Sequence, residues 1–170
     1  MGRRHTVRDT RRGQEFQAFV AGAAGRLLHT ATLLTGESRD DNPRARRLLT
    51  LSLAHTYACW DRLRGEDPYG VARQELATRF ARSVWHRYGG PGALGRSRPH
   101  PDSPLTRLTP RERLVLVLRL YEGVAEEQTA ALLGLPRERI EAICSRATET
   151  LLHRPRETAP RVLGAKAVAR

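Results

Sequence analysis

The chain has 170 residues, which is enough for one ordinary domain or two small ones. Aromatic residues make up 5% of it while alanine, leucine, arginine and glutamate are plentiful, so the composition favours helix over strand. The formal net charge of +12 indicates a polyanionic partner, nucleic acid before membrane. All but one of the thirty basic residues are arginines, a bias that suits phosphate binding but that a GC-rich genome would also produce.

Several classes of protein do not fit this sequence. No apolar run approaches the roughly twenty residues that cross a bilayer, and the N-terminus lacks the apolar stretch of a signal peptide, so we expect a cytoplasmic protein without membrane insertion. Cys59 and Cys144 have no CxxC neighbour and no histidine at ligand spacing, which predicts free thiols and no metal site. Paired carboxylates, a nucleophile motif and a phosphate-binding glycine loop do not stand out, so we expect neither an enzyme nor a cofactor.

The first predicted element is a helix that follows a basic segment. Residues 1–14 are rich in arginine and are expected to be disordered. A helical pattern begins at Glu15 and is expected to reach about Leu34, where Thr35-Gly36 offers a left-handed cap. The apolar residues that recur at three- and four-residue steps, and so share one face, are Phe16, Phe19, Val20, Ala23, Leu27 and Leu28.

Two further helices are predicted before the pattern breaks. Pro43 fits the first turn of a helix over about 43–64, with Asn42 as its cap. Its broad apolar face consists of Leu48, Leu49, Leu51, Leu53, Ala54, Tyr57 and Trp60. A third helix over about 69–88 follows the turn at Gly65. Its inward residues are Val71, Leu76, Phe80, Val84 and Trp85.

A linker divides the chain into two predicted domains. Residues 89–107 contain four prolines and four glycines, which sustain neither a helix nor a strand ladder. We therefore predict one helical domain over 15–88 and a second over 108–153. A flexible basic tail is expected over 154–170.

The second domain begins with a clear helix signal. Thr109 and Glu112 on either side of Pro110-Arg111 predict a capping box with proline at the first helical position. The inner face of this helix is predicted to contain Leu114, Val115, Leu118 and Tyr121. Glu122-Gly123 is expected to end it.

A helix-turn-helix is predicted in the last part of this domain. A short helix over about 126–133 would end at Gly134, and Pro136 would open a helix that reaches about Leu152. Ala130 is small enough for the helix crossing, and the residues expected to fill the angle between the helices are Leu135 and Ile140. Such a unit places its second helix in a major groove, whereas an ordinary helical hairpin would show a similar pattern.

Three segments resemble the extracytoplasmic-function group of sigma factors of bacterial RNA polymerase. LTPRERLVLVLRLYEGVAEEQTAALLGLPRERIEAICSRATETLL (108–152) resembles the promoter-binding region four of that family. LLHTATLLTGESRD (27–40) and YACWDRLRGEDPYGVARQEL (57–76) resemble parts of its region two, and the order of the regions also matches. The resemblance implies an all-α fold of two small domains joined by the linker.

The family also implies a mechanism. Region two grips a coiled coil of the largest polymerase subunit and melts the upstream part of the −10 element, while region four reads the −35 element. The sigma factor itself catalyses nothing. An anti-sigma factor is a further partner that the family implies.

The resemblance places a DNA-binding surface on each domain. In the region-four-like domain the candidate residues are Arg137, Arg139, Glu141, Ser145 and Arg146. Glu141 stands where members of the family carry lysine, and it could accept from a cytosine amino group. In the region-two-like domain cations for phosphates and aromatic faces for unstacked bases come from Arg79, Arg82, Trp85, His86 and Arg87. Core packing is the alternative role for Phe80 and Trp85.

The second helix departs from the family at the surface that meets the polymerase. Family members carry an acidic stretch similar to DAEDLVQE, whereas residues 44–51 read RARRLLTL. Arg44, Arg46 and Arg47 thus replace acids, and with Thr50 they form the predicted interface with polymerase or another protein. Like charges across an interface can cost several kcal/mol. Two hypotheses follow: a sigma-like initiation regulator that binds promoter DNA and polymerase, or a diverged one that has lost ordinary core docking and acts through DNA or a protein partner.

Overall fold

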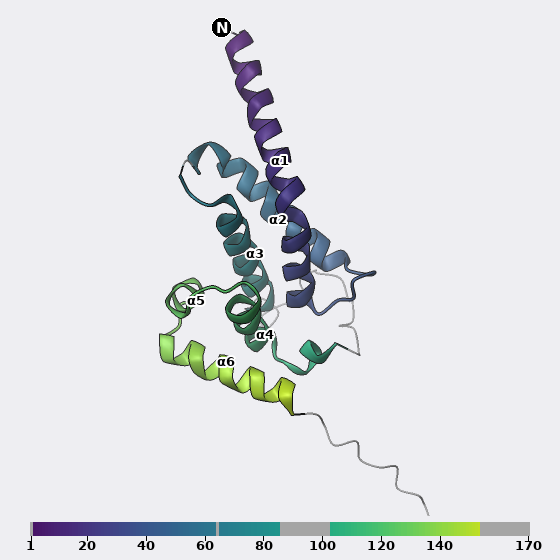
Figure 1. Cartoon of the computed structure of the whole chain (residues 1–170), viewed down its shortest axis with the longest axis vertical. Coiled ribbons are helices and arrows are strands. Elements are labelled where there is room, and N and C mark those ends of the chain that lie inside the picture. Colours follow the sequence, from purple (N-terminus) through teal and green to yellow (C-terminus); the bar gives the residue numbers. More distant parts are fainter. Residues whose placement is uncertain (1, 64, 86–102, 154–170) are drawn as a thin grey trace, which may run out of the picture.

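Helices make up all the regular structure in the part of the chain that the computed structural model describes, which is residues 2–63, 65–85 and 103–153 (Figure 1). The predicted all-α fold is therefore confirmed. In chain order the elements are α1 (Gly2–Thr35), α2 (Pro43–Cys59), the 3-10 helix η1 (Trp60–Arg62), α3 (Pro68–Trp85), the 3-10 helix η3 (Pro104–Arg107), α4 (Pro110–Leu116), the π-helix η4 (Val117–Tyr121), α5 (Glu126–Leu133) and α6 (Arg137–Leu152). We call α1 to α3 the N-terminal half and η3 to α6 the C-terminal half.

The first helix is longer than the sequence pattern predicts. α1 begins at Gly2, so the prediction of a disordered segment over 1–14 is wrong. Contacts with η1 hold part of the extension: Arg12 pairs with Asp61 at 3.3 Å, and next to it the ring of Phe16 lies 5.1 Å from that of Trp60. The predicted end is confirmed, because α1 stops at Thr35 and Gly36 has a φ of 71°.

A buried glutamate starts α2. The carboxylate of Glu37 accepts hydrogen bonds from the backbone N–H groups of Arg44 at 3.1 Å and Ala45 at 2.8 Å, which are otherwise unpaired donors of the first turn. Asn42 occupies the predicted N-cap position, but its side chain donates to the carbonyl of Arg39 at 2.6 Å. The prediction that Asn42 caps the helix with its side chain is therefore wrong.

The buried side of α2 is more polar than predicted. It consists of Ala45, Leu48, Ser52 and Thr56. The hydroxyl of Ser52 donates to the carbonyl of Leu48, and that of Thr56 to the carbonyl of Ser52, which allows both to be buried. Leu51 and Tyr57 are 41% and 38% exposed, so their predicted inward placement is wrong. Both α1 and α3 pack against α2, where Leu49 and Leu53 join an apolar cluster with Leu27 of α1 and Ala72 of α3.

The third helix is capped by an aspartate and anchored in the core. The carboxylate of Asp67 accepts from the backbone N–H groups of Tyr69 at 3.0 Å and Gly70 at 2.9 Å. Leu76 is fully buried and Phe80 is 4% exposed, so the core role of Phe80 is confirmed. The predicted last turn of this helix, residues 86–88, lies outside the described residues.

The predicted capping box at the start of α4 is present. The Glu112 N–H donates to the Thr109 hydroxyl at 3.3 Å, and the Thr109 N–H donates to the Glu112 carboxylate at 2.9 Å. After α4 the backbone widens into η4, which rotates the following side chains relative to an α-helix. Tyr121 is therefore 38% exposed, and its predicted inward placement is wrong. The residues buried as predicted are Leu114, Val115 and Leu118.

The tight turn between α5 and α6 follows the predicted geometry. α5 ends at Gly134, which adopts a left-handed φ of 63°. Pro136 is the residue before α6 rather than its first residue. Ala130 and Ile140 are buried between the two helices, as predicted, and Leu135 packs against them from a half-buried position.

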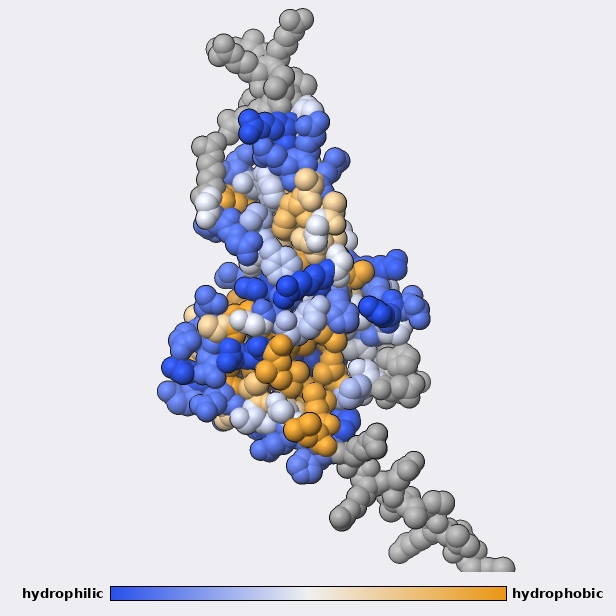
Figure 2. All heavy atoms as spheres, viewed as in Figure 1, coloured by the Kyte–Doolittle hydropathy of each residue, from blue (hydrophilic) through white to orange (hydrophobic). Residues whose placement is uncertain are grey.

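One apolar core runs through both halves. Ala31, Leu34, Leu76 and Phe80 of the N-terminal half share a cluster with Leu114, Val115, Leu118 and Leu133 of the C-terminal half. On the face drawn in Figure 2, apolar residues gather over the part where α4 and α6 lie. The predicted domain boundary at 89–107 stays a prediction for residues 89–102, which are not described, but Pro104–Arg107 forms η3, so the expectation that this stretch sustains no helix is wrong there. None of the described helices is apolar over enough residues to cross a membrane.

Candidate nucleic-acid interface

The outer side of α6 is the strongest candidate for contact with nucleic acid. Ile140, Ile143 and Ala147 bury the inner side of this helix against α4 and α5. The predicted contact residues on this helix are all exposed: Arg137, Arg139, Glu141, Ser145 and Arg146. A sixteen-residue helix with one free side has the size and shape to lie in a major groove.

Ion pairs neutralise much of the positive charge on this side of α6. Arg137 pairs with Glu126 at 3.0 Å and with Glu127 at 2.9 Å, both on α5. The hydrogen bond to Glu126 and the charge of Glu127 raise the pKa of Arg137 above its ordinary value. Arg146 lies 3.9 Å from Glu112. Phosphates would therefore compete with carboxylates for two of the three arginines.

The second candidate surface lies on α3 and is only partly described. Arg79 is half-buried and pairs with Glu75 at 2.5 Å, whereas Arg82 is exposed. The side chain of Trp85, and all of His86 and Arg87, lie outside the described residues. The structure thus places Arg79 and Arg82 on one helix. The predicted DNA contacts of Trp85, His86 and Arg87 stay predictions.

The predicted partner interface is an exposed side of α2. Arg46, Arg47 and Thr50 are exposed, and Arg44 is half-buried beside the C-terminal half. The guanidinium of Arg46 donates to the Asn42 side-chain oxygen at 2.9 Å, which fixes its direction. Leu51 follows Thr50 on the exposed side, so this surface combines arginines with an apolar side chain.

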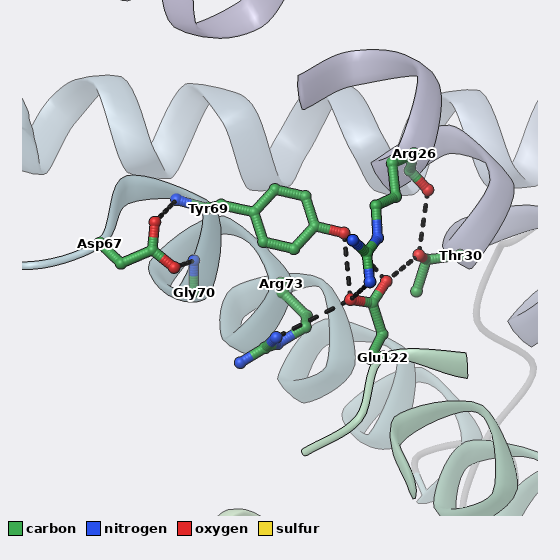
Figure 3. Close-up of polar contacts among 7 residues, drawn as sticks. All are labelled: Arg26, Thr30, Asp67, Tyr69, Gly70, Arg73 and Glu122. Atoms are coloured by element: carbon green, nitrogen blue, oxygen red, sulfur yellow. Dashed lines mark hydrogen bonds and ion pairs between the residues drawn. The ribbon is translucent and has the colours of Figure 1, made fainter. Parts of the chain in front are cut away.

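A cluster between the two halves was not predicted from the sequence (Figure 3). Glu122 follows η4, and its side chain has 0% exposure. Its carboxylate accepts hydrogen bonds from the hydroxyl of Thr30 and from that of Tyr69, the latter at 3.0 Å to each oxygen. Arg26 lies 3.6 Å and Arg73 3.8 Å from the same carboxylate. We call these five residues the Glu122 cluster.

The Glu122 cluster also changes the pKa of Tyr69, its one tyrosine. Burial and, after it, the nearby charge of Glu122 raise the pKa of Tyr69 from 10.0 to about 12. The guanidinium of Arg26 lies 5.3 Å from the centre of the Tyr69 ring, which adds a cation–π contact. From the sequence, Glu122 was visible only as the end of a helix, because its four partners lie on α1 and α3, far away in the chain.

A second contact between the halves is repulsive. Arg113 of α4 is 6% exposed, and burial together with the charge of Arg44 lowers its pKa. Arg44 belongs to α2, so two like charges meet where the halves pack together.

In the part of the chain that is described, no three His, Cys, Asp or Glu side chains lie close enough to hold a metal ion.

Comparisons with known proteins point to one family. Residues 105–153 match the family model for Sigma-70, region 4. The chain is 29% identical over 179 residues to an RNA polymerase sigma-E factor of Streptomyces avermitilis, and the match covers 92% of each protein. The fold is similar to that of the sigma factor RpoE in its complex with the anti-sigma factor NepR from Bartonella quintana, with a TM-score of 0.57 and 19% identity over 81% of this chain and 94% of that one. The region-four match spans the capping box, the Gly134 turn and α6, which favours a helix-turn-helix over an ordinary hairpin.

Proposed function

We propose that the chain is a sigma factor of the extracytoplasmic-function group, with a region four at residues 105–153, and that it directs RNA polymerase to promoter DNA through separate surfaces on its two halves. The observation that carries this proposal is the exposed side of α6. It follows a left-handed turn at Gly134, as the recognition helix of a helix-turn-helix does.

In this proposal α6 reads the −35 element. Arg139 makes no ion pair among the described residues, and it is the first candidate for a phosphate or base contact. Arg137 would exchange Glu126 and Glu127 for phosphate oxygens, an exchange that the multivalent charge of DNA favours at low salt. Glu141 would restrict which bases α6 tolerates, because a carboxylate accepts from cytosine but repels phosphate.

The N-terminal half would supply the remaining contacts. Arg79 and Arg82 of α3 are proposed to bind phosphates near the −10 element, with Trp85, His86 and Arg87 continuing that surface. Arg46, Arg47, Thr50 and Leu51 would dock on the polymerase. The arginines require an acidic patch on the partner, since like charges across an interface are unfavourable.

Two further features follow from the proposed function. The protein acts by binding rather than by catalysis, and it would work in the cytoplasm, where polymerase and promoter DNA are found. The sigma factor of the similar solved structure is in complex with an anti-sigma factor. We propose that a protein of that kind also binds this chain.

Co-purification with core RNA polymerase, followed by run-off transcription, tests the proposal. The full chain should bind core polymerase at low salt and start transcription from promoters that the core alone ignores. Reversal of Arg44, Arg46 and Arg47 to Asp, Glu and Asp tests the docking surface. Weaker binding after reversal would support an acidic partner patch, whereas stronger binding would mean that the arginines oppose docking. If the wild-type chain does not associate at low salt, the proposed function is wrong.

A further inference from the structure

The two halves of the chain are joined by one buried carboxylate. Glu122 belongs to the C-terminal half, while all partners of its carboxylate among the described residues lie on α1 or α3 (Figure 3). A carboxylate with 0% exposure is unfavourable unless its oxygens are paired, and here two hydroxyls and two guanidinium groups surround them. This pairing exists only while the halves are packed together.

The surrounding interface is not uniformly attractive. Arg113 of α4 is buried, and burial together with the charge of Arg44 of α2 disfavours its charged form through like-charge repulsion. The apolar core and the Glu122 cluster oppose that repulsion. Removal of the Glu122 charge contacts should therefore shift the balance between a closed arrangement and an open one.

The size of the closed form conflicts with the proposed use of both DNA surfaces. The part of the structure that holds α3 and α6 is one packed body, because both helices contribute to the shared core, and a body of this size is roughly 40 Å across without the projecting part of α1. Elements at −10 and −35 are about 25 base pairs apart, which is about 85 Å along straight duplex DNA. In the closed form, α3 and α6 share one core and cannot reach both elements together.

We propose that the Glu122 cluster holds the chain in a closed form, and that its contacts must break before α3 and α6 engage both promoter elements. The need for opening rests on the proposed function, whereas the closed form itself does not. Opening would expose the apolar sides of α4 and η4 that now face α1 and α3. Glu122 thus acts as a positioning residue for the halves and touches neither DNA nor polymerase in this role.

Distance measurements between spin labels test the closed form without DNA or polymerase. Labels at Ala58→Cys on α2 and Glu149→Cys on α6 use two exposed positions outside the cluster. Cys59→Ser and Cys144→Ala remove the natural thiols in every sample. The reference chain should give a single short distance. Glu122→Gln should add a longer population, and Glu122→Ala should make that population larger, because Gln keeps the shape and some hydrogen bonds of the original side chain.

A matched control separates this effect from the loss of any carboxylate. Glu75→Gln breaks ion pairs with Arg79 and His55 that lie within the N-terminal half, so its distance should equal that of the reference chain. Circular dichroism checks that each variant keeps its helices. If Glu122→Ala unfolds, Tyr69→Phe removes one contact of the cluster and should still raise the longer population. Identical distances in the reference chain and in every folded cluster variant would overturn the proposal, as would an open reference chain.

Binding to core polymerase on a promoter duplex separates the two proposals. If opening is required, Glu122→Gln should bind this complex several-fold more tightly than the wild-type chain, since less of its binding energy is needed for opening. Equal affinity would overturn the required opening. Failure of both proteins to bind polymerase would instead remove the proposed function, and the closed form would then be judged by the distances.

Discussion

The hydroxyl of Tyr69 lies 3.0 Å from each carboxylate oxygen of Glu122, and this contact joins residues 53 positions apart on opposite halves of the chain. The tyrosine stays protonated in this position because burial and the adjacent carboxylate both disfavour a phenolate. One shared proton donor thus contributes to the packing of α3 against the segment that follows η4.

Above pH 10, the free energy of unfolding of the wild-type chain should fall more steeply with rising pH than that of the Tyr69→Phe variant. The pKa of Tyr69 is raised to about 12 from 10.0, so its contribution is complete below pH 10 and is lost as the pH rises to about 12. Because the ring is partly exposed, we expect about 1 kcal/mol of difference in this range. Denaturant unfolding at pH 9, 10 and 11 measures it, and parallel pH dependence of the two proteins would contradict the assignment.

Gly134→Ala should destabilise the chain, whereas Gly22→Ala should stabilise it. Gly134 has a φ of 63°, which costs an L-residue about 1–2 kcal/mol, although no atom lies within 4 Å of the new Cβ. Gly22 lies inside α1, where alanine is about 1 kcal/mol more favourable and also meets no atom within 4 Å. Thermal unfolding of both variants provides the comparison. If both variants shifted the unfolding temperature in the same direction, the left-handed backbone conformation of Gly134 would not control the turn.

Ile140→Ala should reduce the free energy of unfolding by about 2–5 kcal/mol, since Ile140 is fully buried between α5 and α6. The exposed neighbour Arg139→Ala is the control and should change stability by less than about 0.5 kcal/mol. Urea unfolding followed by circular dichroism measures both values. A small effect of Ile140→Ala would mean that α6 does not depend on this contact.

Arg139→Ala should weaken binding to duplex DNA and make it less dependent on salt. Loss of one phosphate contact lowers the slope of log affinity against log salt concentration by about 0.9. Arg39→Ala removes an exposed arginine from the loop before α2 and serves as the control, with no change of slope expected. Fluorescence anisotropy with a labelled random-sequence duplex at several salt concentrations gives the slopes. Equal slopes for the two variants would exclude a phosphate contact of Arg139.

Glu141→Gln should bind the same duplex several-fold more tightly than the wild-type chain, because it removes a negative charge from the exposed side of α6. Glu149→Gln removes the same charge from the other end of the helix and should have a smaller effect. A larger gain in DNA affinity for Glu149→Gln than for Glu141→Gln would mean that the DNA binds nearer the C-terminal end of α6.

Local signals in the sequence were enough to identify the helix-turn-helix. The Thr109 and Glu112 capping box, the left-handed Gly134 and the bounds of α5 depend on residues only a few positions apart. These features are therefore predictable without knowledge of the rest of the fold.

Errors arose where a partner from another part of the chain decided the outcome. Leu51 is exposed and Tyr57 is only partly covered by Phe16 of α1, and periodicity alone cannot tell which side of α2 its neighbours will cover. Tyr121 faces outward because the backbone widens into a π-helix after α4. The first part of α1, which the sequence did not indicate, includes Arg12, whose partner Asp61 lies on η1, far away in the chain.

The sequence by itself determined the helical class, the order of the elements and the exposed side of α6, because these depend on interactions between near neighbours in the chain. Only the tertiary structure decided that Glu122 would be buried between the halves and that Arg44 would lie beside Arg113. Such contacts depend on how helices pack across many intervening residues, and no local pattern in the sequence encodes that packing.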